Sequence, residues 1–189
     1  APLRRTIQLA FNVADTHLSY HPEWPAVLVQ QGIVLIDDSA VSVWADRARL
    51  FESTVDRLSV ETRVNTKGQI TLALAGKVLG PAADGLRVLN ESALAGTVGA
   101  AFADWTATGS LETDVALRMN ISDKSVVPQV DVATRWRDVD LLVMPGNLAV
   151  QAVNGEFAYS TSRGFRSTAL TGELWGETVT ASLEQSRRA

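Results

Sequence analysis

Apolar and polar residues alternate with a period of two along most of this 189-residue chain. Near its beginning, Ile7, Leu9, Phe11 and Val13 alternate with polar or small residues. This pattern is typical of β-strands that bury one face, because successive side chains of a strand point to opposite sides. The same alternation recurs at Ile70, Leu72 and Leu74, at Leu111, Val115, Leu117, Met119 and Ile121, at Val130, Val132 and Trp136, at Val139, Leu141 and Val143, at Leu148 and Val150, at Phe157 and Tyr159, and at Leu174, Val179 and Leu183. It predicts about ten to twelve strands.

Short segments rich in turn-forming residues separate these runs. They lie at residues 37–39, 66–68, 122–125, 145–147 and 162–164, and they contain Gly, Pro, Asn, Asp or Ser. Turn chemistry of this kind joins neighbouring strands as hairpins. Because hairpins connect antiparallel strands, we predict an antiparallel sheet.

One segment, at about residues 81–105, has a helical period instead of a strand period. Its apolar residues fall on one stripe of a helix, namely Leu86, Leu89, Leu94, Val98, Phe102 and Trp105. We expect this stripe, up to Phe102, to face the sheet. We expect Arg87, Glu91 and Asp104 to face water.

Residues that typically begin, cap or end helices predict the bounds of this helical insertion. Pro81 suits a first helical turn, since its ring already fixes a helical φ. Ser92 is a candidate cap for a second helix after a break at residues 90–91. Gly109 is expected to end the helical region.

The chain also resembles itself. Residues 50–55 match residues 174–179, and the pair 31–32 matches the pair 154–155. A repeat of this kind indicates a stacked architecture in which similar units follow one another.

The alternation also changes phase inside two of the predicted strands. The changes fall near residues 14–16 and near residues 137–139. A phase change within a strand is what a β-bulge produces, so we predict a bulge at each place. We therefore predict two copies of a four-strand unit, over about residues 5–64 and about residues 128–187.

Composition narrows the possible functions. The chain is 46% hydrophobic, has a formal net charge of −4 and contains no cysteine. These values argue against a disordered chain and against a strongly basic nucleic-acid binder. The absence of cysteine excludes disulfides, thiolate catalysis and cysteine metal sites. The chain begins at Ala1 without a signal-peptide pattern, so we expect it to be part of a longer protein.

One short helical segment cannot cover the apolar faces of so many strands. Three arrangements solve this problem. The sheet folds on itself as a sandwich or closed barrel, it curls around a ligand, or it forms an open trough whose lining is covered by something outside this chain.

The later part of the chain points to one of these arrangements. Residues 153–159, 163–165 and 169–176 resemble the YhdP branch of the AsmA-like proteins, with a short Gly-Glu-Phe strand, a glycine turn and a Leu-x-Gly-x-Leu-aromatic-Gly strand. Residues 80–111 look like the helical insertion of that family and the strand after it. The resemblance covers most of residues 70–183 and, more weakly, the first repeat.

The resemblance implies a fold and a function. Such proteins are anchored in the inner membrane of Gram-negative bacteria by an N-terminal helix and extend through the periplasm as a long groove of antiparallel strands. They are thought to carry phospholipid between the inner and outer membranes. We therefore expect residues 1–189 to be one elongated internal segment of such a protein, all-β, with a strongly curved antiparallel sheet open as a trough.

The resemblance also implies the partners of this segment. We expect it to contact phospholipid acyl chains and the rest of the parent chain, to bind no nucleic acid, and to reach a membrane only through the parent protein. We expect no enzymatic activity, cofactor or metal. The predicted lining of the lipid groove consists of Ile7, Leu9, Phe11, Ile70, Leu72, Leu74, Leu111, Val115, Leu117, Met119, Val130, Val132, Trp136, Leu141, Phe157, Tyr159 and Leu174.

A second hypothesis is a structural or interaction module. It would be a closed β-sandwich within a large periplasmic envelope protein that affects outer-membrane integrity. Whether protein covers the apolar side of the sheet distinguishes the two, because a trough for lipid must leave that side open.

Candidate catalytic and metal-binding groups are few. His17 and His21 are four residues apart, but Pro22 prevents the helix that would bring them together as metal ligands. Of two aspartate pairs, residues 37–38 fall in a turn, where Asp is favoured for local hydrogen bonds. The other pair, residues 138 and 140, shares a predicted strand with arginines, so we expect these aspartates to lie on a charged outer face. No nucleotide-binding or hydrolase motif occurs.

Overall fold

The computed structural model describes residues 7–38, 40–96, 99–123, 125–182 and 184. Its eleven strands form one antiparallel sheet, in which neighbours follow the order of the chain. The strands are β1 (Gln8–Leu18), β2 (Val27–Asp37), β3 (Ala40–Leu50), β4 (Ser53–Val64), β5 (Ile70–Pro81), β6 (Thr106–Asn120), β7 (Gln129–Val143), β8 (Leu148–Ser160), β9 (Gly164–Ser167), β10 (Leu170–Leu174) and β11 (Glu177–Ala181). The predicted number of strands and their antiparallel pairing are confirmed.

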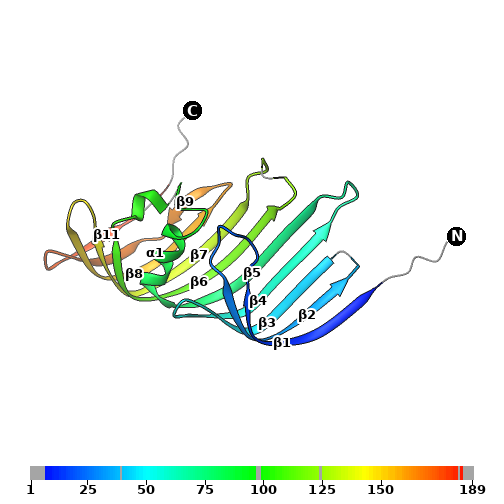
Figure 1. Cartoon of the computed structure of the whole chain (residues 1–189). Helices are drawn as coiled ribbons and strands as arrows, with labels where there is room; N and C mark the ends of the chain where they lie inside the picture. The colour runs from blue at the N-terminus through cyan, green and yellow to red at the C-terminus, as the bar shows by residue number, and fades with distance from the viewer. Residues whose placement is uncertain (1–6, 39, 97–98, 124, 183, 185–189) are drawn as a thin grey trace.

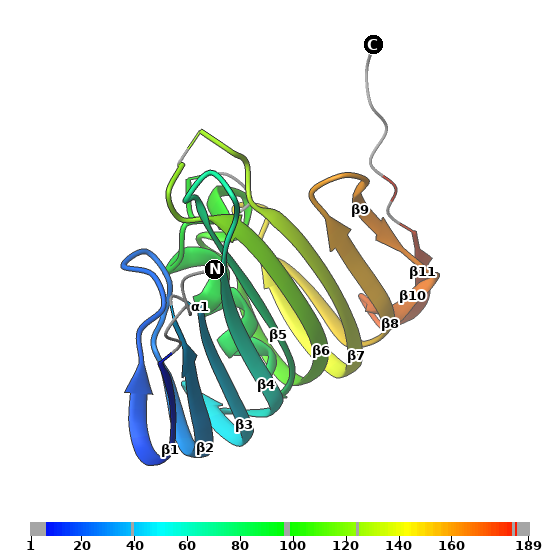
Figure 2. The ribbon, with the colours of Figure 1, turned by 90° about the vertical axis from the view of Figure 1, so that its right-hand side faces the viewer.

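The sheet is open. It begins at β1 and ends at β11, and β8 pairs with β9 along one half and with β10 along the other. Figures 1 and 2 show one continuous curved sheet with a small helix against one face. The expectation of an all-β, curved, open trough is confirmed, whereas the closed sandwich is not the fold of this chain.

Direct pairing between strands places opposite residues on the same face of the sheet. One such row crosses seven strands and is apolar throughout, consisting of Phe11, Val34, Val43, Val60, Leu74, Leu117 and Val130. We call the face that carries this row the inner face and the opposite face the outer face. The main core is on the inner face, and its most deeply buried members are Val29 and Ala48.

Helix α1 (Ala82–Asn90) follows β5 directly and covers one end of the inner face. Its Leu86 packs against a second core cluster formed by Ala82, Ala107, Val139 and Val153. This contact confirms that Leu86 faces the sheet. Leu89, Leu94 and Phe102 are half-buried, Arg87, Glu91 and Asp104 are exposed as predicted, and Val98 lies outside the described residues.

Polar contacts fix α1 to the turn between β3 and β4. The Asp84 carboxylate accepts hydrogen bonds from the Ser53 hydroxyl at 2.6 Å and from the Glu52 backbone N–H at 3.0 Å. The Arg87 guanidinium lies 3.7 Å from the centroid of the Phe51 ring, a cation–π contact. The helix is therefore held by its sequence-distant neighbours as well as by its own propensity.

The predicted second helix after residue 91 is wrong. Instead, the Ser92 hydroxyl accepts a hydrogen bond from the backbone N–H of Leu94 in a local turn, and only a short 3₁₀ segment, η1 (Gly99–Phe102), follows. Gly96 and Gly99 lower the helix propensity of this stretch, and the packing does not restore it.

Gly109 does not end the helical region, because it lies inside β6. It has a φ of +88°, and a Cβ added there would approach the carbonyl oxygen of Asp138 to 2.3 Å. The glycine is needed for the close approach of β7 at a bulge and not for a helix end.

Only one of the two predicted bulges is present. The register between β7 and β8 shifts between Trp136 and Val139, and Asp138 has a φ of +47°, so this bulge is confirmed. Asp15 has a similar φ of +46°, but β1 and β2 pair without a register shift, so the bulge predicted there is wrong. The register break at that level lies between β2 and β3, around Gln31. That the two four-strand units are copies stays a prediction.

Candidate functional site

The predicted groove residues all lie on the inner face. Strand pairing brings Leu74 opposite Leu117, Leu72 opposite Met119, and Leu111 opposite Trp136. Val132 lies opposite both Val115 and Tyr159. Val150 lies between Leu141 and Leu174, which is near the β11 end of the sheet.

The sequence-based list omitted inner-face residues of three strands. Val29 of β2, Val43 of β3, and Val55 and Val60 of β4 are buried in the same core as the predicted residues. Their alternation was a usable signal, since Val27 and Val29 or Leu58 and Val60 are also two apart. Conversely, Ile7, Leu9 and Phe11 at the β1 end are largely exposed, with Ile7 at 64%.

Exposure of the inner face to water changes along the sheet. Leu117 is 4% exposed and Val130 is 7% exposed, whereas the neighbouring Val115, Val132 and Tyr159 are half-buried. These three residues lie opposite one another on β6, β7 and β8. The accessible part of the apolar face therefore includes the middle of these strands.

The connection between β1 and β2, residues 19–26, covers part of the inner face. Its Tyr20 and Trp24 pack against the main core, and Figure 1 shows this connection rising in front of the strands. Burial raises the pKa of Tyr20 to about 12, because the charged tyrosinate loses its hydration there. A single-layer sheet thus shields part of its own apolar side with a loop.

Aromatic side chains gather on the inner face of β7, β8 and β9. The ring centroid of Phe157 is 6.3 Å from that of Trp136 and 5.5 Å from that of Phe165, and Tyr159 is 4.7 Å from Phe165. Phe165 was not predicted, because β9 is too short to show alternation. Aromatic pairs at these separations stabilise one another by more than their buried area contributes. We therefore expect these side chains to hold the inner face of β7 to β9 in a fixed arrangement.

The outer face carries the charges. A network of ion pairs crosses β5 to β8, in which Glu112 binds Lys77 and Arg137, and Arg135 binds Glu156 with a 2.8 Å contact. The hydrogen bond from Lys77, together with the charges around it, lowers the pKa of the Glu112 carboxyl. This network makes the outer face of β5 to β8 polar, whereas Ile33 and Trp44 are exposed on the outer face of β2 and β3.

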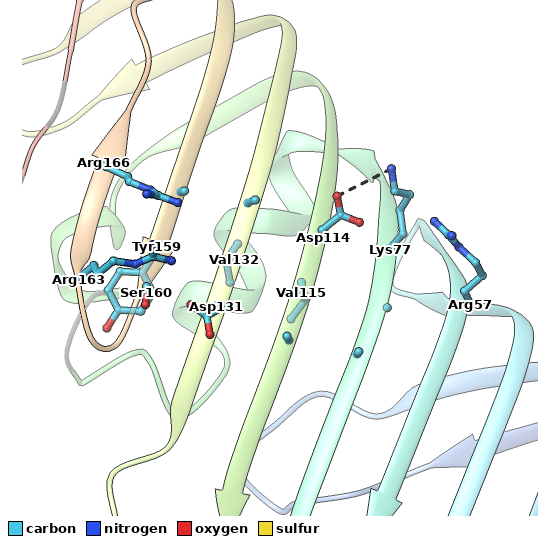
Figure 3. Close-up of a pocket in the computed structure, with 15 residues that line it drawn as sticks. Arg57, Lys77, Asp114, Val115, Asp131, Val132, Tyr159, Ser160, Arg163 and Arg166 are labelled. Atoms are coloured by element: carbon cyan, nitrogen blue, oxygen red, sulfur yellow. Dashed lines mark ion pairs between the residues drawn. The ribbon is translucent and has the colours of Figure 1, made fainter.

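A cavity of about 460 Å³ lies next to this network on the outer face (Figure 3). Its floor follows two neighbouring rows of the sheet in which alanines replace long side chains, at Ala75, Ala116, Ala133 and Ala158. Basic side chains stand at its two ends, with Arg57 and Lys77 on one side and Arg163 and Arg166 on the other. A smaller cavity adjoins it and includes Arg118.

The aspartates and histidines considered as catalytic groups have local structural contacts. The Asp138 carboxylate accepts a hydrogen bond from the Asn154 side chain, and the Asp140 carboxylate accepts one from the backbone N–H of Ala152 at 2.8 Å. Both bonds satisfy groups at the β7–β8 bulge. Asp38 accepts from the backbone N–H of Ile7, and the His21 ring nitrogen accepts from that of Glu23.

No group of three or more His, Cys, Asp or Glu side chains is placed to hold a metal ion within the part of the chain that the structure describes. None of the described helices is long and apolar enough to cross a membrane.

An open, curved antiparallel sheet with one apolar and one charged face defines a β-groove segment. The family model described as YhdP protein matches residues 4–189, so the chain belongs to the YhdP family and the resemblance seen in the sequence is confirmed. Comparison with curated proteins gave no match, and neither did comparison with solved structures. Membership of the family associates the chain with lipid transport in the periplasmic envelope, and the family is not known for enzymatic activity.

Proposed function

We propose that this chain is a non-enzymatic segment of a periplasmic bridge that shields phospholipid acyl chains in its inner groove during transfer between the inner and outer membranes. The observation that supports this proposal best is the half-buried apolar row of Val115, Val132 and Tyr159 on the inner face of an open sheet, opposite the ion pairs of the outer face. In this proposal the parent protein is anchored in the inner membrane, and the segment meets membranes only through it.

The driving force for such shielding is the transfer of acyl chains out of water. Each buried methylene contributes about 0.8 kcal/mol, so a chain of some sixteen carbons gains on the order of 10 kcal/mol when it is fully covered. This gain depends on continuous cover and on no single contact. A long, uniform apolar face therefore suits the task better than a closed pocket with a few specific contacts.

The accessible part of the inner face offers a place for the acyl chains. Val115, Val132 and Tyr159 lie side by side across β6, β7 and β8 and are only half-buried. Phe157 and Phe165 extend this surface with aromatic rings. Lipid chains lying here would cover apolar area that water now reaches, while the headgroups stay toward solvent.

Photocrosslinking from adjacent residues tests the proposal. Val132 and Ala133 are neighbours in β7 but point to opposite faces of the sheet. We would place the photoreactive amino acid p-benzoylphenylalanine at each position, in cells that make the full-length protein carrying this segment. We expect phospholipid adducts from position 132 and not from position 133. The absence of adducts from position 132 in a folded protein would overturn the proposal.

A further inference from the structure

Arginines that form no ion pair with the other described residues line the two cavities on the outer face. Within the described residues, five arginines form no ion pair, and four of them line these two adjoining cavities: Arg57, Arg118, Arg163 and Arg166. The fifth, Arg47, lines neither cavity. The arginines next to the cavities, such as Arg135 and Arg137, are neutralised by carboxylates. Four of the five described arginines without an ion pair therefore lie along these cavities, whose lining also includes the carboxylates of Asp114 and Asp131.

Two of these arginines lie close together at one end of the larger cavity. Arg163 is in the turn after β8 and Arg166 is in β9, and Figure 3 shows both side chains extending in the same direction into the cavity. Adjacent guanidinium groups repel each other unless an anion lies between them. The Ser160 hydroxyl, which also lines the cavity, shares a 3.0 Å hydrogen bond with the Ser162 hydroxyl.

We propose that this end of the outer cavity binds a phosphate group, held by Arg163 and Arg166. Guanidinium presents a planar set of donors that matches phosphate oxygens in a bidentate manner. A phosphate monoester carries about −1.5 to −2 charges at neutral pH and so balances two arginines, whereas one carboxylate would balance only one. The cavity is an open depression, and its alanine floor beside the two arginines leaves room for an organic group attached to the phosphate.

The other groups around the cavity determine where the phosphate lies. Asp131 and Asp114 are on the two middle strands and repel an anion from the centre of the floor. At the opposite end, Lys77 already shares its charge with Glu112 and Asp114, so among the described residues Arg57 is the cation there that forms no ion pair. The phosphate therefore lies at the Arg163 and Arg166 end, and the alanine floor contacts the rest of the ligand.

The Arg166 side chain and the side chains of the proposed lipid path lie on opposite faces of the sheet, although Val115, Val132 and Tyr159 also border the cavity from the strands that form its floor. Val132 and Ala133 are consecutive residues of β7, and their side chains point to the inner face and the outer face respectively. The inference therefore does not depend on the proposed function, and either can fail alone. The phosphate has two possible sources, a soluble organic phosphate or the exposed phosphomonoester headgroup of a lipid such as phosphatidic acid.

Calorimetric titration of the 189-residue chain with glycerol phosphate tests the site, and flotation with vesicles containing phosphatidic acid tests the lipid source. We expect saturable binding that Arg163→Gln and Arg166→Gln each weaken by about tenfold or more. Arg166→Lys keeps the charge but not the bidentate geometry and should fall between the wild type and Arg166→Gln. Arg47→Gln is the matched control, since Arg47 is exposed and unpaired but outside the cavities, and it should change affinity less than about twofold.

Each result decides between the sources or against the site. Binding of glycerol phosphate assigns a soluble ligand, and binding of the vesicles alone, lost in Arg166→Gln, assigns a headgroup. Absence of saturable binding to both overturns the proposal, as does equal weakening by Arg47→Gln. Preferential binding of an oligoglutamate peptide, with no binding of either phosphate probe, would also overturn it and indicate a protein partner. Circular dichroism and melting temperature confirm that each variant is folded.

Discussion

Val132 and Leu117 are both on the inner face, but water reaches them to different extents. Leu117 is 4% exposed, and its neighbours in the row, Leu74 and Val130, cover it. Val132 is half-buried between Val115 and Tyr159. A carboxylate at a wet position keeps part of its hydration, whereas one in a dry core does not.

Replacement of each residue by Asp should therefore separate fold from function. We expect Leu117→Asp to destabilise the chain by about 3–5 kcal/mol, because it buries an unpaired charge. Val132→Asp should cost less than about half as much, yet abolish lipid adducts from a photoreactive residue placed nearby at Val115. Urea midpoints measure the first effect and crosslinking measures the second. A fully folded Leu117→Asp variant would show that the row through Leu117 is not a dry core.

Tyr20 gives the inner face a pH dependence. Its pKa is raised to about 12 by burial, above an unfolded value near 10. Between these values the unfolded chain loses the phenolic proton while the folded chain keeps it, so stability is complete below pH 10 and falls as the pH rises toward 12. We expect the urea midpoint to decrease over this range. Tyr20→Phe should remove that decrease, and an unchanged slope in this variant would assign the effect to other groups.

At the scale of single elements, the sequence predicts the strands better than their irregularities. Period-two alternation is a direct result of burying one face, so it located β1, β5 and β6 and the turns at residues 66–68, 122–125 and 145–147. It named no run for β2, β3 or β4, and it divided β7 and β8 into two runs each, because bulges interrupt the alternation within these long strands. The helix after Pro81 also formed, but its extension past Asn90 did not, since glycines there leave the outcome to packing. Gly109 was misassigned because its role depends on the carbonyl of Asp138, which is distant in sequence.

The contact between Gly109 and Asp138 makes a sharp prediction about the β6–β7 pairing. Gly109→Ala combines a φ of +88° with a Cβ that would lie 2.3 Å from the Asp138 carbonyl oxygen, so we expect a loss of about 3 kcal/mol or more. Gly146→Ala is the control, because it lies in the β7–β8 turn with no atom within 4 Å of its added Cβ. Thermal melting of the two variants measures the difference. Similar melting temperatures would mean that the bulge relaxes without cost.

At the scale of the whole molecule, the two faces of one sheet separate two kinds of chemistry. The apolar inner face follows from alternation, which predicted its residues in β1 and in β5 to β8 but not Val29, Val43 and Val60 of β2 to β4. The outer cavity could not be predicted, because Arg57, Lys77, Arg163 and Arg166 come from three strands and a turn that only the register brings together. The alanines of the cavity floor could not be predicted from the sequence either, because small residues do not contribute to a pattern of apolar and polar alternation.

A single-layer sheet also needs cover for its apolar face where helix α1 does not reach. Residues 19–26 provide part of this cover, since Tyr20 and Trp24 pack against the main core from the inner side. We expect Tyr20→Ala combined with Trp24→Ala to increase binding of the apolar dye ANS and to lower the melting temperature, because the core beneath these rings becomes exposed to water.

The turn at residues 65–69 supplies the control for this prediction. It is closed by its own hydrogen bonds, from the backbone N–H groups of Lys67 and Gln69 to the Asn65 side chain, and it contributes no side chain to either core cluster. Thr66→Ala with Lys67→Ala should therefore leave dye binding unchanged. If the loop variant also binds no additional dye, the aromatic residues do not shield the inner face. If dye binding rises and lipid crosslinking at position 132 rises with it, the loop limits access to the groove that we propose for the acyl chains.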